Sequence, residues 1–342
     1  MRTRSSRLFA AAGLAAALAA GCSTDGGSED APGEGTVTVV ASTNVWGSVA
    51  AAVGGDQVSV TSIVAAGDPH SYQVSARDAA TLRDADLIVA NGGGYDDFIA
   101  QALGGDGELP LVEAFAIHER IGHDEDPAAG GDPSAEPSGE PSADPSTEPS
   151  AEASGEPVEE PSGDGHEHGE NEHVWYDLHT VGAVADDLAV RLGDLRPEAK
   201  DTFTANAAAF RAKLEDLESR VTDLAAAHDG TEVAATEPVA HHLLAEAGLH
   251  DVTPPEFVEA VEEGNDPPAA VVAQLGQVVE GAGVAALVHN PQTETAVVSQ
   301  LVGQAEQAGV PVVEMTETLP DGQDYLTWMA EQITALAQAL DR

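Results

Sequence analysis

Residues 165–178 read G-H-E-H-G-E-N-E-H-V-W-Y-D-L and lie between a long polar run and a clearly helical pattern. His166, His168 and His173 fall within eight positions, with glutamates between them. Imidazole and carboxylate groups are the ligands of divalent transition metals. Val-Trp-Tyr follows His173, and burial of this apolar tripeptide would hold its imidazole in place. We therefore expect a built metal site at His173, with the other two histidines in a mobile loop before it or, alternatively, incidental in a solvated acidic loop.

The polar run before this stretch is of low complexity. Residues 124–165 repeat Pro-Ser-(Ala/Gly/Thr)-(Glu/Asp), and such a chain buries too little apolar surface to offset its ordering entropy. Histidines flank the repeat on both sides: His118, His123, His166 and His168. We therefore predict a disordered auxiliary metal loop over residues 118–172, rather than a spacer with accidental histidines.

The charge of the chain limits its partners. The formal net charge is -47, from 60 acidic and 13 basic residues. Nothing in this composition would neutralise phosphates, which excludes nucleic acid as a partner. It also argues against docking on anionic lipid through basic contacts. Strong negative charge instead raises the local concentration of cations.

The first residues indicate a compartment. Arg2, Arg4 and Arg7 precede an apolar run over residues 8–20 that has the length of a signal peptide. The segment Leu-Ala-Ala-Gly-Cys ends at Cys22, the only cysteine, and resembles a bacterial lipobox. It departs from that motif in having alanine three positions before the cysteine. We expect a signal peptide at 1–21, a lipid on Cys22, a flexible tether at 22–35 and attachment to the extracytoplasmic face of the cell membrane; ordinary secretion with a free thiol is the alternative.

The first half of the chain alternates strands and helices. Strand-like runs cover residues 36–41, 57–64 and 86–91, and helix-like segments cover 46–53, 75–85 and 95–103. This alternation predicts a parallel sheet, at which ligands bind beside the carboxyl ends of the strands. His70 follows the second strand, after the stiff turn at Pro69, and is therefore placed as a ligand.

A long helix separates this half from a second one. Helices are predicted over 179–192 and 197–228, the latter with apolar residues three, four or seven apart. Strands then follow at 232–236, 284–289 and 310–313, with helices at 239–247, after 266–268, and at 293–308 and 324–340. We predict two α/β lobes, each a parallel sheet flanked by helices, joined by one rigid helix. The lobes are residues 36–117 with 173–192, and 229–342; the connecting helix is 193–228.

Three motifs together resemble one family. They are G-D-P-H-S-Y at residues 67–72, A-D-L-I-V-A-N-G at 85–92 and E-N-E-H-V-W-Y-D at 170–177. In this order, around a loop rich in histidine and acid, they are similar to the solute-binding lipoproteins of bacterial zinc/manganese ABC importers, of cluster A-I. The resemblance covers about residues 36–342 apart from the Pro/Ser/Glu insert. It implies two lobes with the metal between them, and a monomer without enzymatic activity that delivers its cation to a permease and its ATPase.

The resemblance also implies four ligands from four loops. His70 and His173 match the first two. The third, which is His or Glu in the family, corresponds to Glu237, and we place the fourth on Glu317. Asp321 and Glu314 remain competitors for the fourth position. His241 and His242 compete with Glu237, but they fall inside a helical pattern, so a structural or exposed role is expected for them.

The ligand set leaves the metal open. Two imidazoles and two carboxylates make a harder site than three imidazoles and one carboxylate, and this suits manganese. The histidine-rich loop resembles the zinc members of the family. We expect Zn2+ as the transported ligand, with Mn2+ close behind.

Two other functions fit parts of the pattern. A surface metal buffer or adhesin without a transporter would leave the same motifs. A zinc-dependent hydrolase would need an open metal position and a general base. The sequence contains no H-E-x-x-H and no nucleophile motif beside its histidines, which argues against the hydrolase.

Overall fold

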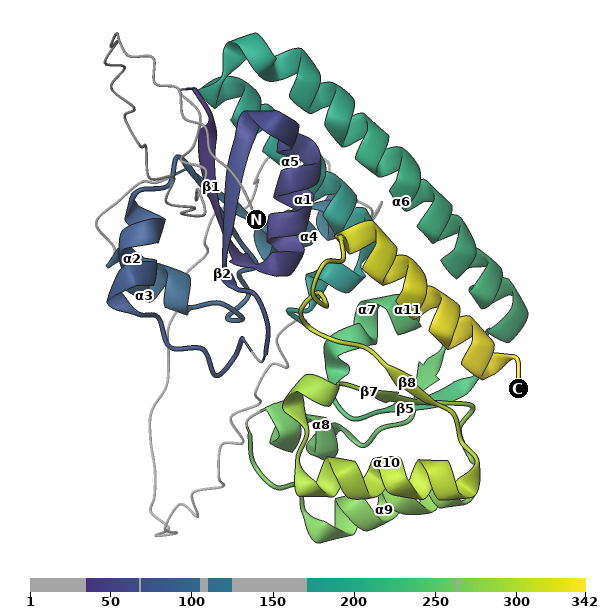
Figure 1. Ribbon diagram of the computed structural model, residues 1–342. Helices are drawn as coiled ribbons and strands as arrows, with labels where there is room; N and C mark the ends of the chain where they lie inside the picture. The colour runs from purple at the N-terminus through teal and green to yellow at the C-terminus, as the bar shows by residue number, and fades with distance from the viewer. Residues whose placement is uncertain (1–34, 68, 105–109, 125–170, 263) are drawn as a thin grey trace, which may run out of the picture. The chain divides into compact units, whose positions relative to one another are not determined.

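The computed structural model describes residues 35–67, 69–104, 110–124, 171–262 and 264–342 (Figure 1). The predicted signal peptide, the lipidation site at Cys22, the tether up to residue 34 and most of the predicted auxiliary loop, with His166 and His168, lie outside these residues. The side chain of His123 is also outside the description. The part that is described holds the elements that build the two lobes.

The first lobe is built on a four-stranded parallel sheet. Its strands are β1 (Val37–Thr43), β2 (Val58–Val64), β3 (Leu87–Ala90) and β4 (Leu111–Glu113), in the order β2-β1-β3-β4. β1 is buried along almost its whole length, and all of β3 is buried. Strands covered on both faces read as continuous apolar runs, which is why V-T-V-V-A-S-T and L-I-V-A form the centre of the sheet.

Helices cover both faces of this sheet (Figure 1). The helices are α1 (Asn44–Gly54), α2 (Ala76–Arg83), α3 (Phe98–Leu103), α4 (Ala114–Asp124) and α5 (Leu178–Leu195). Successive strand residues point to opposite faces. Val39 therefore packs in the cluster that contains α1 and α5, while Val40 packs with Leu82 of α2 and Phe98 of α3.

The connecting helix is α6 (Lys200–His228), 29 residues long, which corresponds to about 44 Å. It begins after η3 (Pro197–Ala199), because proline suits a first turn. The predicted helix over 197–228 is thus confirmed, while residues 193–195 belong to α5. One buried stripe runs along α6 and packs against α5, α1, α7 and α11 (Tyr325–Leu340): Phe203, Ala207, Phe210, Leu214, Leu217, Val221 and Leu224.

The second lobe repeats the strand order of the first. Its parallel strands are β5 (Glu232–Ala235), β6 (His250–Asp251), β7 (Leu287–His289) and β8 (Val312–Glu314), in the order β6-β5-β7-β8. The other helices are α7 (His241–Glu246), α8 (Pro255–Glu262), α9 (Ala269–Glu280) and α10 (Ala296–Ala308). The predicted fold class is confirmed. The elements missing from the prediction are β4, β6, α4 and α8, and both strands are edge strands of two or three residues, too short for a visible pattern.

Buried tyrosines join the last helix and its preceding loop to the segment after His173. The hydroxyl of Tyr325 on α11 donates to the Trp175 carbonyl at 2.7 Å. The Tyr176 hydroxyl lies 2.9 Å from the Thr316 carbonyl oxygen and 2.7 Å from Oε1 of Gln332, and its one proton is shared between these two acceptors. The rings of Trp175, Tyr176 and Tyr325 are buried in the hydrophobic cluster that includes the buried stripe of α6. These bonds fix the segment that carries His173 against elements of the second lobe.

We expect Tyr325→Phe to lower the free energy of unfolding of the metal-free protein by about 1–3 kcal/mol, because it leaves the buried Trp175 carbonyl without its donor. Urea unfolding followed by circular dichroism measures this change. Tyr72→Phe is the matched control, since its hydroxyl bonds Asp78 at a partly exposed position where water can replace it. Equal losses in both variants would contradict the role of the buried bond.

Candidate metal centre

Three of the four predicted ligands lie in loops that follow the carboxyl ends of strands, and the fourth, His173, lies before a short turn. His70 follows β2, Glu237 follows β5 and Glu317 follows β8. His173 immediately precedes η2 (Val174–Tyr176), the short turn that leads into α5. Ligand sites form at such edges of parallel sheets, where loops from several strands meet.

His173 is held as its neighbours in sequence suggested. It is 2% exposed, and the Val-Trp-Tyr segment after it is buried. The Oδ1 atom of Asn171 accepts hydrogen bonds from the His173 backbone N–H at 2.9 Å and from its Nδ1 at 3.1 Å. A proton on Nδ1 leaves the lone pair on Nε2, the arrangement that orients histidine toward a metal. Burial is the main cause that lowers the pKa of His173, with a further electrostatic contribution from nearby histidines, and this keeps the ring neutral.

His70 lies against both His173 and Glu317. The ring centroids of the two histidines are 5.9 Å apart, and Nε2 of His70 is 3.9 Å from Oε2 of Glu317. Tyr95 stacks edge-on to His70 at 4.8 Å and donates its hydroxyl to Glu317 at 2.9 Å. The His70 side chain is 32% exposed and lines a hollow of about 500 Å³.

A glycine run sets the position of Tyr95. Gly92, Gly93 and Gly94 all have positive φ, between 65° and 91°. A Cβ at Gly93 would meet the Phe115 ring at 2.7 Å. Only glycine allows this backbone to pass so close to that ring, and the turn delivers Tyr95 into the site.

Glu237 and Glu317 are both buried, at 6% and 1% exposure. Nδ2 of Asn290 donates to both carboxylates, at 2.9 Å to Glu317 and through a short bond to Glu237. The Oδ1 atom of Asn290 accepts from the Gln292 backbone N–H at 2.9 Å, so the amide nitrogen faces the carboxylates. Thr293 also donates to Glu237. Two carboxylates held this close repel each other, and a dication between them would remove that repulsion.

The structure therefore brings the predicted ligands together through a continuous set of contacts. His173 lies beside His70, His70 beside Glu317, and Asn290 joins Glu317 to Glu237. Two imidazoles and two carboxylates from both lobes converge there.

Sequence reasoning passed over a third carboxylate. In the described residues, one ligand atom each from His70, Glu172 and His173 lies within 4.8 Å of the other two. Glu172 is partly buried, and its carbonyl accepts from Asn91 at the end of β3. Its position directly before His173 in the sequence could have identified Glu172 as a further candidate ligand. The supporting residues Asn290 and Tyr95 were also missed, although Asn290 follows β7 and the strand-end rule used for His70 would have found it.

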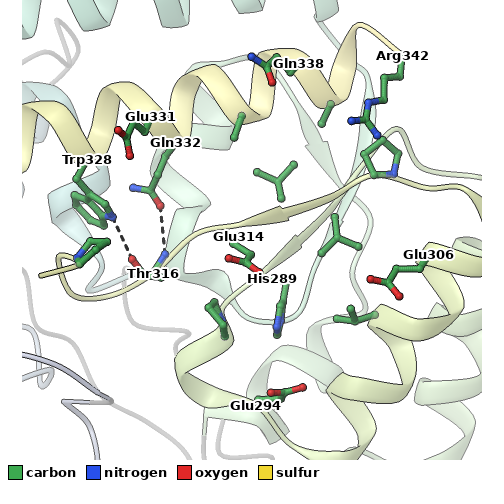
Figure 2. A pocket seen from close by; sticks show the side chains of 18 of the residues that line it. His289, Glu294, Glu306, Glu314, Thr316, Trp328, Glu331, Gln332, Gln338 and Arg342 are labelled. Atoms are coloured by element: carbon green, nitrogen blue, oxygen red, sulfur yellow. Dashed lines mark hydrogen bonds between the residues drawn. The ribbon is translucent and has the colours of Figure 1, made fainter. Parts of the chain in front are cut away.

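The competing ligands lie elsewhere. Figure 2 shows Glu314 beside His289 at a hollow of about 790 Å³ bordered by β8, α10 and α11. Glu314 is exposed there, and Asp321 is exposed in the following loop. In contrast, Gln292 accepts hydrogen bonds from the backbone N–H groups of Glu317 and Thr318 and turns that loop inward.

Three other histidines that the sequence analysis singled out lie on helices or at a helix start. His118 belongs to α4 rather than to a loop, because α4 extends to Asp124. His242 bonds the Asn171 carbonyl through Nε2 at 2.9 Å, and His241 is exposed at the start of α7.

Comparison with known proteins gives one family. The sequence model of the ZnuA family, described as the periplasmic component A of the zinc-uptake complex, matches residues 39–339 of this chain. The zinc-binding lipoprotein AdcA of Streptococcus pneumoniae R6 is 23% identical over 302 residues, which are 85% of this chain and 53% of AdcA. The manganese-binding lipoprotein MntA of Halalkalibacterium halodurans is 25% identical over 211 residues, 61% and 56% of the two chains. The chain spans about half the length of these relatives.

Solved structures share the fold. The periplasmic zinc-binding protein TroA of Treponema pallidum matches with a TM-score of 0.65 at 17% identity, over 90% of this chain and 100% of TroA. The laminin-binding protein Lmb of Streptococcus agalactiae matches with a TM-score of 0.64 at 20% identity, over 89% and 99%. At these identities the likeness supports the architecture of two lobes.

We expect Glu317→Gln to weaken divalent metal binding at least about 100-fold, because loss of even a hydrogen-bonding partner of a ligand costs about 10–100-fold. Isothermal titration of the metal-stripped protein measures the affinity. Glu314→Gln removes the same charge at the exposed end of β8, three residues earlier, and its affinity should remain that of the wild type. If both variants lose affinity equally, general charge rather than ligation holds the ion.

Proposed function

Because the chain belongs to the ZnuA family of zinc-uptake components, we propose that it is the extracytoplasmic metal receptor of an ABC importer. It captures a divalent transition metal between its two lobes and delivers the ion to a membrane permease with its ATPase. The observation that carries this function is the meeting of His70, His173 and two buried carboxylates from four separate loops. It acts as a monomer and is not an enzyme.

In this proposal His70, His173, Glu237 and Glu317 are the four ligands. Each carboxylate offsets one charge of a dication, so the occupied site is close to neutral in a buried setting where a net charge is expensive. Four protein ligands complete a tetrahedral shell and leave no position for an activated water. This closed site supports transport and argues against the zinc hydrolase.

The transported ion is Zn2+, with Mn2+ as the close alternative. The family description and the relatives named AdcA are zinc-binding, whereas MntA is named as manganese-binding. The two carboxylate ligands suit manganese and the two imidazoles suit zinc. The tilt toward zinc therefore rests on the relatives, and affinity measurements on this chain decide it.

A lipid on Cys22 would keep the receptor beside its permease. In the described ranges no helix is both long and apolar enough to cross a bilayer. Two relatives, AdcA and MntA, are named lipoproteins, which supports an extracytoplasmic location. The apolar run before Cys22 supports export followed by acylation.

Metal competition tests the principal site and its third ligand. We expect Glu237→Ala to abolish tight binding, and Glu237→His to shift preference toward Zn2+ over Mn2+, because imidazole replaces a hard oxygen ligand. His242→Ala should keep tight binding in the cleft. Zn2+ and Mn2+ affinities of the three variants and the wild type are measured by titration. Tight binding that survives Glu237→Ala but not His242→Ala would move the third ligand to His242.

Transport and anchoring are tested in cells. Deleting the gene should lower uptake of radioactive zinc at nanomolar supply, and the wild-type copy should restore it. Cys22→Ser should release the protein from the membrane fraction into the soluble fraction, with the lipid lost from its mass spectrum. Unchanged zinc uptake after deletion would favour the surface buffer or adhesin over the receptor.

A further inference from the structure

A second group of histidines surrounds a cavity of about 640 Å³ outside the cleft. It is bordered by α4, α5 and α7, which come from distant parts of the sequence (Figure 1). The lining residues with metal-binding groups include His118, Asp177, His179, His241, His242 and Glu246. Neither the cleft ligands nor the predicted mobile loop accounts for four histidines around one cavity.

His118 is oriented by a carboxylate. Its Nδ1 lies 2.9 Å from Oδ2 of Asp177 and 2.9 Å from Oγ1 of Thr180. Asp177 also caps α5, which fixes its position. Burial acts to raise the pKa of Asp177, but hydrogen bonds from His118 and Thr180 outweigh it and lower the pKa, so the carboxylate is charged. Nδ1 of His118 donates to this carboxylate, as in the carboxylate–histidine pairs that bind zinc.

His242 is oriented by a backbone carbonyl. Its Nε2 donates to the Asn171 carbonyl at 2.9 Å, so the lone pair lies on Nδ1. Asn171 also accepts from Nδ1 of the cleft ligand His173 through its side chain. The same residue therefore orients one histidine in each place.

The spacing of the two rings suits a shared ion. The centroids of His118 and His242 are 4.9 Å apart, with the ring planes at 67°. With metal–nitrogen distances of about 2.0–2.1 Å, two imidazoles on a tetrahedral ion have centroids about 5 Å apart. The rings of His118 and His242 already lie at about this separation.

The third ligand must come from a side chain that moves. Within the described residues, the grouping of three ligand atoms inside 4.8 Å is the one in the cleft, so the side chains around this cavity do not yet form such a group. His241 is the candidate, since it is exposed, lines the cavity and has its ring 5.7 Å from that of His242. A site that must reorder one side chain binds more weakly than one with its ligands in place.

We propose that His118, His242 and His241 form a second divalent transition-metal site, of lower affinity than the cleft and completed by water. It lies in the folded part of the chain. It differs from the predicted auxiliary loop, in which His118 was grouped with His123, His166 and His168. The inference goes beyond the proposed function, because it does not require an ion in the cleft.

The test uses the full chain with every other site removed. The background carries His70→Ala and Glu317→Gln to disable the cleft, and alanine at His123, His166 and His168. Zn2+ is titrated against a chromogenic chelator, and Co2+ is titrated by its visible absorption, which reports tetrahedral nitrogen ligation. We expect one equivalent in this background, weakened at least about tenfold by His242→Ala and by His241→Ala.

The matched control is His250→Ala, which removes an exposed histidine on β6 and should leave the equivalent unchanged. Circular dichroism verifies that each variant is folded, and His242→Gln tests the ligand without opening a cavity. Absence of any Zn2+ equivalent in the background, or an equivalent that His242→Ala and His241→Ala leave unchanged, would overturn the site. Since the cleft is disabled throughout, neither result bears on the proposed receptor function, which the wild-type titrations test separately.

Discussion

Two buried carboxylates beside one amide group form the constraint on which the candidate site depends. Glu237 and Glu317 share Nδ2 of Asn290, and their mutual repulsion opposes this arrangement in the absence of a cation. Neutral hydroxyl groups help to position both carboxylates: Tyr95 donates to Glu317 and Thr293 to Glu237.

The two sheets make this convergence geometrically simple. Both have the same strand order, and in both the strands are parallel, so all carboxyl ends face the same edge of each sheet. Each sheet can then contribute ligands from one edge only. The long helix α6 packs against elements of both lobes. Tyrosine hydrogen bonds also join α11 to the segment after His173. Packing away from the candidate site thus influences the distances between its side chains.

Histidine orientation follows one rule in two places. At His173 the acceptor is the side chain of Asn171, and at His118 it is the carboxylate of Asp177. In both, a hydrogen-bond acceptor faces Nδ1 and orients the ring. Asn171 and Asp177 lie six positions apart around the same short turn, so a few residues of sequence orient histidines at both places. The difference between the cleft and the second cavity lies in their anions, because only the cleft combines two buried carboxylates with its imidazoles.

The sequence by itself determined the fold class and the two histidines of the cleft. Long apolar runs identify buried parallel strands, and the position of His70 after a strand and of His173 before Val-Trp-Tyr is readable from neighbours in the chain. The resemblance placed the fourth ligand on Glu317 but kept Glu314 and Asp321 as competitors, because carboxylates look alike in the sequence until packing buries one of them. Asn290 and Tyr95 were not found. The very short strands β4 and β6 were invisible for a related reason: two or three residues show no period. Only the tertiary structure brings residue 70 to residue 317, since that contact depends on how two sheets and one long helix pack rather than on any local pattern.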